Sequence, residues 1–220
     1  MSAIWIFREP RSGSTWFSNH VTTSLRRTHC FLDRNRLGFS IEHELSFSEE
    51  NFRNTIAQHN IDNTVFTTHF FSALTLMNEF DNPILIRCAR KDKAEQFMSH
   101  MLVKYSPTHF TNITNDENLN KTKESFQELS KIETVVPKKE VDDYMRMVSS
   151  WNTLWDQYAS THQNYTIYYE DLCDFGIDIP EIGLYNCKID SSGLTSQLPD
   201  YKTKVFLNYD MIQKWINEYR

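Results

Sequence analysis

The opening of the chain constrains its fold more than any other segment. The apolar run from Ala3 to Phe7 is typical of a short buried strand. A tight polar loop follows at positions 10–15, with the sequence PRSGST, and the stretch from Trp16 to Leu25 can form a helix. A strand, a tight polar loop and a helix in this order open many nucleotide-binding α/β folds. This opening therefore predicts an α/β domain.

Further apolar runs along the chain favour a parallel sheet. They lie at Val65–Phe66, at Ile84–Ile86 and at Tyr165–Tyr169. Short buried strands that are separated by helical stretches usually pair in parallel. We therefore predict a three-layer, P-loop-like α/β domain with a central, mainly parallel sheet of about four or five strands.

Two helices follow from the spacing of apolar residues. Positions 151, 154, 155 and 158 recur at i, i+3, i+4 and i+7, and positions 212, 215, 216 and 219 repeat that spacing. Asp210 stands where it can cap the second helix. Residues 106–139 are polar and rich in Asn, Lys and Glu, so we expect a lid or an acceptor-side insertion there. The length suits a single domain over residues 1–220.

Composition and charge argue against several classes of protein. Apolar residues make up 40% of the chain and aromatic residues 14%, which is typical of a globular protein rather than a disordered one. The net charge of −6 argues against a protein that coats nucleic acid or an anionic membrane. No cysteine pair has CxxC spacing, so neither zinc nor a redox dithiol is indicated. The N-terminal apolar run is too short for a signal peptide or a membrane span, and we expect a soluble, cytoplasmic protein.

The polar loop carries the residue types that hold an anion. A helix N-terminus presents backbone N–H groups to phosphate, glycine allows close approach, and hydroxyls and a forked cation complete the set. These residues are Arg11, Ser12, Gly13, Ser14 and Thr15. Against the Walker A pattern G-x-x-x-x-G-K-[ST], Gly13 and Thr15 match, whereas Ser14 stands at the lysine and Arg8 at the first glycine. The loop therefore suits one phosphate-sized group better than a triphosphate.

Four segments together resemble motifs of sulfotransferases. Residues 10–16, PRSGSTW, resemble the 5′-phosphosulfate loop, written P-[KR]-S-G-[ST]-[ST]. Residues 90–99, RKDKAEQFMS, look like the R-R-D-K-x-x-Q-A-x-S run of the bacterial trehalose-sulfotransferase-like family. Residues 169–172, YEDL, resemble a Y-E-D-[LM] segment, and residues 68–70, THF, resemble the K-T-H-[LF]-P segment of cytosolic sulfotransferases. The chain departs from the cytosolic enzymes at Thr67, where they have lysine, and it lacks their C-terminal R-K-G segment.

The resemblance implies a co-substrate and the residues that bind it. The co-substrate is 3′-phosphoadenosine 5′-phosphosulfate (PAPS), and no metal is implied. The resemblance assigns its 5′-phosphosulfate to Arg11, Ser12, Gly13, Ser14 and Thr15. It assigns the 3′-phosphate to Arg90 and Ser99, with Arg87 as the substitute if the strand register differs. It assigns the adenine to Trp16 and Tyr169, two residues that a protein core would equally use for packing.

The catalytic base has three candidates. His69 follows a strand at its expected carboxyl end, where ligands bind in parallel sheets. A histidine there can take a proton near neutral pH, since the ordinary pKa of histidine lies close to it. Glu42 and Glu44 lie in a region comparable to the one that supplies a glutamate in the trehalose-sulfotransferase-like family. The sequence favours His69 narrowly.

These observations predict an enzyme that transfers a sulfuryl group from PAPS to a hydroxyl or amine acceptor. The acceptor is expected to be a small molecule or a carbohydrate, and a lipid head group, a phenol or a peptide also stays open. Neither a nucleic-acid partner nor a membrane span is expected. Two alternatives stand beside this prediction: a small-molecule kinase with a divergent phosphate loop, and a catalytically inactive nucleotide-binding protein.

Overall fold

In the computed structural model the chain divides into two compact units. One is Met1–Lys91 with Ser150–Ile189, and the other is Asp92–Ser149 with Asp190–Arg220. The single domain predicted over residues 1–220 stays a prediction. The residues that the structure describes are 2–33, 36–38, 49–58, 63–69, 71–105, 133–189, 203 and 205–219.

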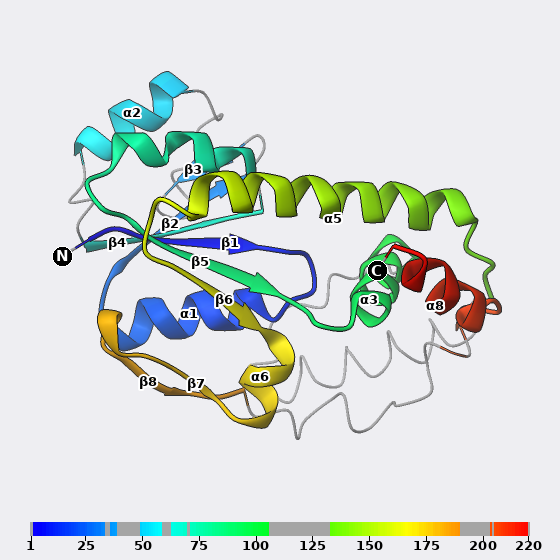
Figure 1. Cartoon of the computed structure of the whole chain (residues 1–220). Coiled ribbons are helices and arrows are strands. Elements are labelled where there is room, and N and C mark those ends of the chain that lie inside the picture. Colours follow the sequence, from blue (N-terminus) through cyan, green and yellow to red (C-terminus); the bar gives the residue numbers. More distant parts are fainter. Residues whose placement is uncertain are drawn as a thin grey trace. The chain divides into compact units, whose positions relative to one another are not determined.

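The first unit is built on a mainly parallel sheet, which confirms the predicted α/β fold (Figure 1). Among the described residues the strand order is β3-β2-β4-β1-β5-β6. The strands are β1 (Ile4–Arg8), β2 (Thr28–Asp33), β3 (Arg36–Gly38), β4 (Thr64–Thr68), β5 (Ile84–Ala89) and β6 (Asn164–Tyr168). All pair in parallel except β3, which lies antiparallel to β2 at the edge. Sequence analysis missed β2 and β3, because polar residues interrupt both segments.

The strand order reverses at β1. From β1 the chain goes to β2, returns to β4 between β2 and β1, and then crosses β1 to form β5 on its other side. In open parallel sheets, ligands bind outside the carboxyl ends of the strands at such a reversal. The loop that follows β1 lies at this point, so the topology places the PRSGST segment where a ligand is expected.

One face of the sheet is lined by aromatic side chains. Trp5 and Phe7 alternate onto this face of β1, and both are fully buried. Trp5 stacks on Phe66 of β4 with 4.5 Å between ring centroids. Phe7 lies 5.6 Å from Phe71, at the start of η3 (Phe71–Glu79), and 5.9 Å from Trp155, in α5 (Lys138–Ala159). These contacts fix η3 and the C-terminal part of α5 over this face.

The other face of the sheet is aliphatic and is covered by α1 (Ser14–Ser24). Ile4 and Ile6 of β1 pack with Phe17 and Val21 of that helix in one buried cluster. Burying a side chain of this size stabilises the fold by about 1.5–3 kcal/mol. Helices therefore cover both faces, and the first unit has the three layers that the sequence predicts (Figure 1).

Smaller elements complete the first unit. The helix α2 (Glu49–Gln58) precedes β4 along the chain, and α6 (Tyr169–Asp174) follows β6 directly. After α6 come β7 (Ile177–Ile179), the short helix η4 (Pro180–Ile182) and β8 (Leu184–Cys187), with β7 and β8 paired antiparallel.

The second unit is helical among its described residues. It contains α3 (Lys93–Tyr105), the first part of α5, and α8 (Tyr209–Asn217). The helix predicted around positions 212–219 is confirmed, but its predicted cap is wrong. The N-cap residue is Asn208, and Asp210 lies in the first turn, where a carboxylate suits the helix dipole. The Asn208 side chain pairs instead with the backbone of Val136, donating to its carbonyl at 2.8 Å and accepting from its amide at 3.0 Å.

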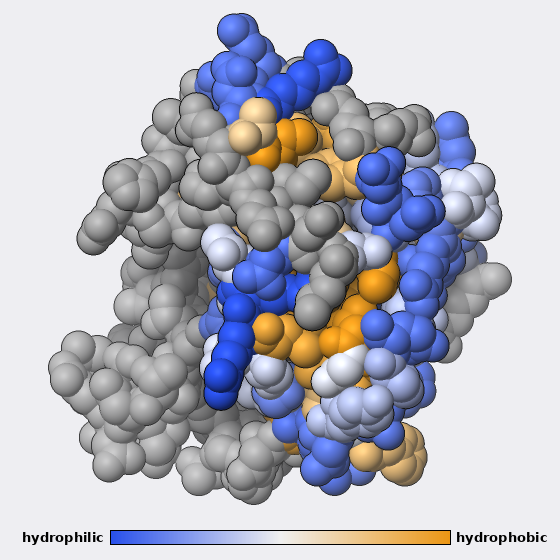
Figure 2. Space-filling view, turned by 90° about the vertical axis from the view of Figure 1, so that its left-hand side faces the viewer, coloured by the Kyte–Doolittle hydropathy of each residue, from blue (hydrophilic) through white to orange (hydrophobic). Residues whose placement is uncertain are grey.

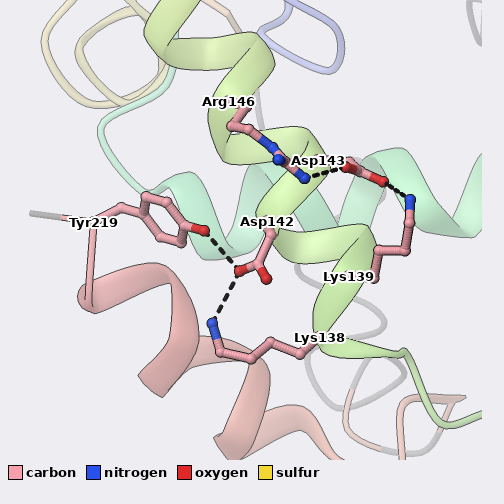
Figure 3. A network of polar contacts seen from close by, with 6 residues as sticks. All are labelled: Lys138, Lys139, Asp142, Asp143, Arg146 and Tyr219. Atoms are coloured by element: carbon pink, nitrogen blue, oxygen red, sulfur yellow. Dashed lines mark hydrogen bonds and ion pairs between the residues drawn. The ribbon is translucent and has the colours of Figure 1, made fainter.

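Charged residues on the first turns of α5 connect that helix to α8 (Figure 3). The Tyr219 hydroxyl, just after α8, donates to Asp142 Oδ1 at 2.6 Å, and Lys138 Nζ donates to the same oxygen at 2.9 Å. These two hydrogen bonds, with the Tyr219 bond contributing most, lower the pKa of Asp142. Lys139 and Arg146 pair in the same way with Asp143. Of the predicted insertion at 106–139, residues 106–132 lie outside the described residues, and the last two belong to α5.

Figure 2 views the molecule from the side on which β1 and β5 begin, opposite the carboxyl ends of those strands. Hydrophobic residues show there between hydrophilic ones. The PRSGST loop, His69, Arg90 and Tyr169 follow the other ends of the strands. Within the described parts of the chain, no helix is both long and apolar enough to cross a membrane.

Candidate functional site

The loop between β1 and α1 is shaped by hydrogen bonds of its own. The buried Ser12 hydroxyl donates to the Glu9 carbonyl at 2.7 Å, which closes the turn. The helix then begins at Ser14, and the Phe17 amide donates to the Gly13 carbonyl at 3.1 Å. No side-chain cap hydrogen bond forms at Gly13, and no acidic residue occupies the first turn. The first amide N–H groups of any α-helix have no acceptor within that helix, so this end attracts an anion.

Gly13 is required at its position for two reasons. Its φ of 69° lies in the left-handed region, which costs most residues free energy. In addition, a Cβ at this position would lie 2.5 Å from Tyr169 Cδ2 and 3.3 Å from Ile189 Cδ1. The loop therefore packs closely against the Tyr169 ring, which comes from the start of α6.

Arg8 is a site residue that the sequence analysis missed. It ends β1, and its guanidinium lies across the start of α1, where Nε donates to Ser14 Oγ at 3.3 Å and Nη2 donates to Thr15 Oγ1 at 2.6 Å. The strand alternation offered a signal, because Arg8 shares the face of Ile4 and Ile6 that α1 covers. The Ser14 and Thr15 hydroxyls, which the sequence predicts to bind an anion, thus already accept hydrogen bonds from Arg8.

Arg11 lies at the exposed tip of the loop. Its φ of 61° is left-handed, a conformation that is uncommon for a residue other than glycine. Such backbone strain occurs often at ligand sites, where the surrounding structure holds it. Ser14 is 4% exposed beneath this tip, whereas Thr15 is exposed.

His69 contacts the backbone of Arg8, the residue that ends β1 just before the loop. It directly follows β4, and its Nδ1 lies 2.7 Å from the carbonyl oxygen of Arg8. A carbonyl oxygen can only accept, so Nδ1 carries the hydrogen. In the neutral ring the lone pair then lies on Nε2, which is the arrangement that a general base needs.

Arg90 follows β5, and its guanidinium carbon lies 4.4 Å from the centroid of the Tyr169 ring. Its Nε is buried and has no hydrogen-bond partner among the described residues; Glu170 Oε1 lies 3.8 Å away. A buried N–H group without a hydrogen-bond acceptor costs about 1–3 kcal/mol, and the Glu170 carboxylate beside it balances the charge of the guanidinium. Burial raises the pKa of Tyr169 to about 12, which keeps its hydroxyl neutral.

The acidic residues after Tyr169 hold the segment that carries Arg90. Glu170 Oε2 accepts from the Lys91 amide at 3.0 Å, and Asp171 forms an ion pair with the Lys91 ammonium group. The YEDL motif thus connects the end of β6 to the end of β5. Ser99, the other predicted 3′-phosphate ligand, is half-buried on α3 in the second unit. Its assignment to that phosphate stays a prediction.

Arg87 does not substitute for Arg90. It lies within β5, and its Nε and Nη2 donate to the fully buried Glu9 carboxylate at 2.9 and 2.5 Å. Its Nη2 also donates to Asn152 Oδ1 of α5 at 2.5 Å, and the guanidinium lies 5.5 Å from the Phe71 ring centroid. Arg87 is therefore buried on the aromatic face of the sheet, where the Glu9 carboxylate balances its charge.

Trp16 has neighbours that suit a packing role. It is half-buried on α1, stacks on His20 with 4.9 Å between ring centroids, and packs against the aliphatic core cluster. Its assignment to the adenine stays a prediction, as does that of Tyr169. Glu42 and Glu44, the alternative bases, lie outside the described residues.

Burial shifts the pKa of two other titratable groups of the sheet toward the neutral form. His29 of β2 lies 2.9 Å from Thr67 Oγ1 through its Nε2, and burial, followed by the charge of Arg8, lowers its pKa. Burial also raises the pKa of the Cys88 thiol. In the described ranges, no group of three or more His, Cys, Asp or Glu side chains is arranged to hold a metal ion.

The site thus joins four strand ends of the first unit through direct contacts. His69 contacts the Arg8 backbone, Gly13 packs against Tyr169, and Tyr169 stacks beneath Arg90. The arrangement offers a proton acceptor, a helix N-terminus and several cations within one unit. Searches of family models, of curated proteins and of solved structures returned no match to this chain.

Proposed function

We propose that this protein is a PAPS-dependent sulfotransferase. The observation that carries the proposal is the continuous set of contacts from His69 through the PRSGST loop to Tyr169 and Arg90. These residues come from all four segments that resemble sulfotransferase motifs, and Tyr169 and Arg90 are the first residues of theirs. They meet at the carboxyl ends of β4, β1, β5 and β6, where the strand order reverses.

The reaction would be an in-line displacement at sulfur. The acceptor oxygen forms a new S–O bond while the S–O bond to the 5′-phosphate breaks. The bonding electron pair leaves with the phosphate, giving 3′-phosphoadenosine 5′-phosphate (PAP) and a sulfate ester. His69 Nε2 takes the acceptor proton, since its Nδ1 already carries one.

The loop would stabilise the charge that develops on the leaving phosphate. The amide N–H groups at the start of α1 and the Arg11 guanidinium are donors of the required kind. Arg90 would bind the 3′-phosphate through its guanidinium group, which lies over the Tyr169 ring. Positioning and electrostatics would then supply most of the rate.

The arrangement around Glu9 favours this reaction over the kinase alternative. Kinases of the P-loop type hold a magnesium ion with carboxylates near the phosphates. Glu9 adjoins the loop, but its carboxylate is buried against Arg87 and is already neutralised by it. This acid is therefore poorly suited to a metal-bound triphosphate.

Nucleotide preference tests the proposal. We expect calorimetry to show that PAP binds at least about tenfold more tightly than AMP, because a charge-assisted hydrogen bond from Arg90 contributes about 1.5–3 kcal/mol. ATP with magnesium serves as the comparison for the kinase alternative. Equal affinities for PAP and AMP, or a preference for ATP with magnesium, would contradict the proposal. Screening hydroxyl-bearing metabolites with labelled PAPS then identifies the acceptor.

A further inference from the structure

We infer that Arg8, a residue outside the four resembling segments, supplies a fixed positive charge for the 5′-phosphate end of the nucleotide. The inference rests on the proposed function and names a further binding residue of the same site. Arg8 ends β1, and its side chain reaches the first turn of α1, the end of the helix that attracts anions.

The hydrogen bonds of Arg8 prepare the loop hydroxyls to act as donors. A hydroxyl group has one hydrogen to donate and an oxygen that accepts. Ser14 Oγ and Thr15 Oγ1 both accept from the guanidinium, at 3.3 and 2.6 Å. Their own hydrogens can therefore point away from Arg8 toward a third group. An anion is the partner that such hydroxyls, next to a cation and a helix N-terminus, would favour.

The contact of Arg8 with Thr15 also resembles the contact of a magnesium ion in Walker A loops. In Walker A loops the Ser or Thr hydroxyl after the lysine binds magnesium, and Thr15 matches that position. Here Thr15 Oγ1 accepts instead from Arg8 Nη2 at 2.6 Å. A guanidinium stays charged at any physiological pH, so this cation is a permanent part of the loop.

The acid next to Arg8 along the chain pairs with another arginine. Glu9 follows Arg8 along the chain, but strand alternation directs it to the aromatic face, where Arg87 pairs with it. The charge of Arg8 contributes to the lowered pKa of His29 on the neighbouring strand β2, so its field acts on this side of the sheet.

The test compares two ligands that differ only in the 5′-phosphate. PAP carries both phosphates, whereas adenosine 3′-monophosphate lacks the 5′-phosphate. Calorimetry on the full chain should show that R8M and R8Q lower the affinity for PAP by about ten- to a hundredfold, as expected for a lost charge-assisted hydrogen bond. Their affinity for adenosine 3′-monophosphate should stay within about twofold of the wild type.

Two controls separate this role from a structural one. R26M removes one positive charge from the exposed turn beyond the other end of α1, and its affinities should not change. R8Q keeps a side chain that can donate to Thr15, so it decides the question if R8M fails to fold. Folded variants that bind PAP normally, or that lose both ligands equally, would overturn the inference. A wild-type protein that shows no preference for PAP over AMP would instead overturn the proposed function.

Discussion

His69 and Arg11 are held in different ways by the same loop. His69 is oriented by a 2.7 Å contact between Nδ1 and the Arg8 carbonyl, so its ring direction and its tautomer are both set by the backbone. Arg11 lies at an exposed tip in a left-handed conformation. A base must be oriented before the acceptor arrives, whereas a long cationic side chain can adjust to the leaving group.

The proposed role of His69 as the base leads to a prediction about turnover. His69→Ala should lower kcat by about two to four orders of magnitude, the usual effect of removing a general base. PAP affinity should stay nearly unchanged, because the base contacts the acceptor and not the nucleotide. Steady-state kinetics with an acceptor from the screen, together with calorimetry for PAP, measures both quantities.

His162 provides the matched control for this variant. Its Nδ1 also lies 3.0 Å from a backbone carbonyl, that of Tyr158, but it precedes β6 at the opposite end of the strand. His162→Ala should therefore retain full turnover. If His69→Ala stays active while a folded Glu42 or Glu44 variant loses activity, the base is a glutamate and the kinship with the trehalose-sulfotransferase-like family is closer.

The junction of β1, loop and α1 depends on one glycine. Gly13→Ala places a Cβ at a φ of 69° and 2.5 Å from the Tyr169 ring. The left-handed conformation alone costs about 1–2 kcal/mol for a residue with a Cβ. The displaced Tyr169 ring should add to that cost and disturb the contact with Arg90. We therefore expect a lower free energy of unfolding and weaker PAP binding.

Gly183→Ala isolates the contribution of the Tyr169 contact. Gly183 has a φ of 71°, but a Cβ there would meet no atom within 4 Å. Denaturant unfolding should show that Gly13→Ala costs more than Gly183→Ala, and only the former should affect PAP binding. Equal costs for the two variants would show that the Tyr169 ring adjusts freely and does not support the loop.

The contact between α5 and the end of α8 should make stability depend on pH. The Tyr219 hydrogen bond lowers the pKa of Asp142 most, with Lys138 second. A carboxyl group whose pKa is lowered by folding stabilises the protein above its unfolded-state pKa, and this stabilisation is lost as the pH falls through the folded-state value. Tyr219→Phe should therefore raise the pKa of Asp142 toward the ordinary aspartate range and reduce the loss of stability on acidification.

Carboxyl NMR titration measures this change, and Asp143 is the internal control. Its pKa is lowered by Lys139 first, and among the described residues its carboxylate accepts from Lys139 and Arg146, not from Tyr219 (Figure 3). The pKa of Asp143 should stay the same in Tyr219→Phe. An unchanged pKa for Asp142 would show that the hydroxyl contributes little to its charge state.

Across the whole molecule, the candidate site lies where the sheet topology predicts a ligand. The first unit brings strand ends from residues 8, 68, 89 and 168 to one edge. Apolar burial on both faces of the sheet holds these ends in place, so a loop of only a few residues can be oriented precisely. The YEDL segment adds a second connection through Lys91, which joins the ends of β5 and β6.

The sequence by itself determined the strand–loop–helix opening and the parallel α/β class, and it predicts an anion site in the PRSGST loop. These are local properties: an apolar run must be buried, and Gly13 with its hydroxyl neighbours has the same chemistry in any fold. The same holds for the apolar spacing that predicted parts of α5 and α8. Asp210 was misassigned as a cap because capping depends on where the helix begins, which varies by one or two residues.

Only the tertiary structure decided which distant groups meet. The position of β4 between β2 and β1, the pairing of Arg87 with Glu9 and the Tyr169 ring under Arg90 all join residues far apart in the chain. A buried arginine needs a carboxylate, but its own neighbours along the chain do not indicate which one it will find. The strand register brought Glu9 to Arg87, and it left the Arg90 Nε without a hydrogen bond among the described residues, with Glu170 Oε1 3.8 Å away. That choice depends on the packing free energy of the whole sheet, which no local pattern contains.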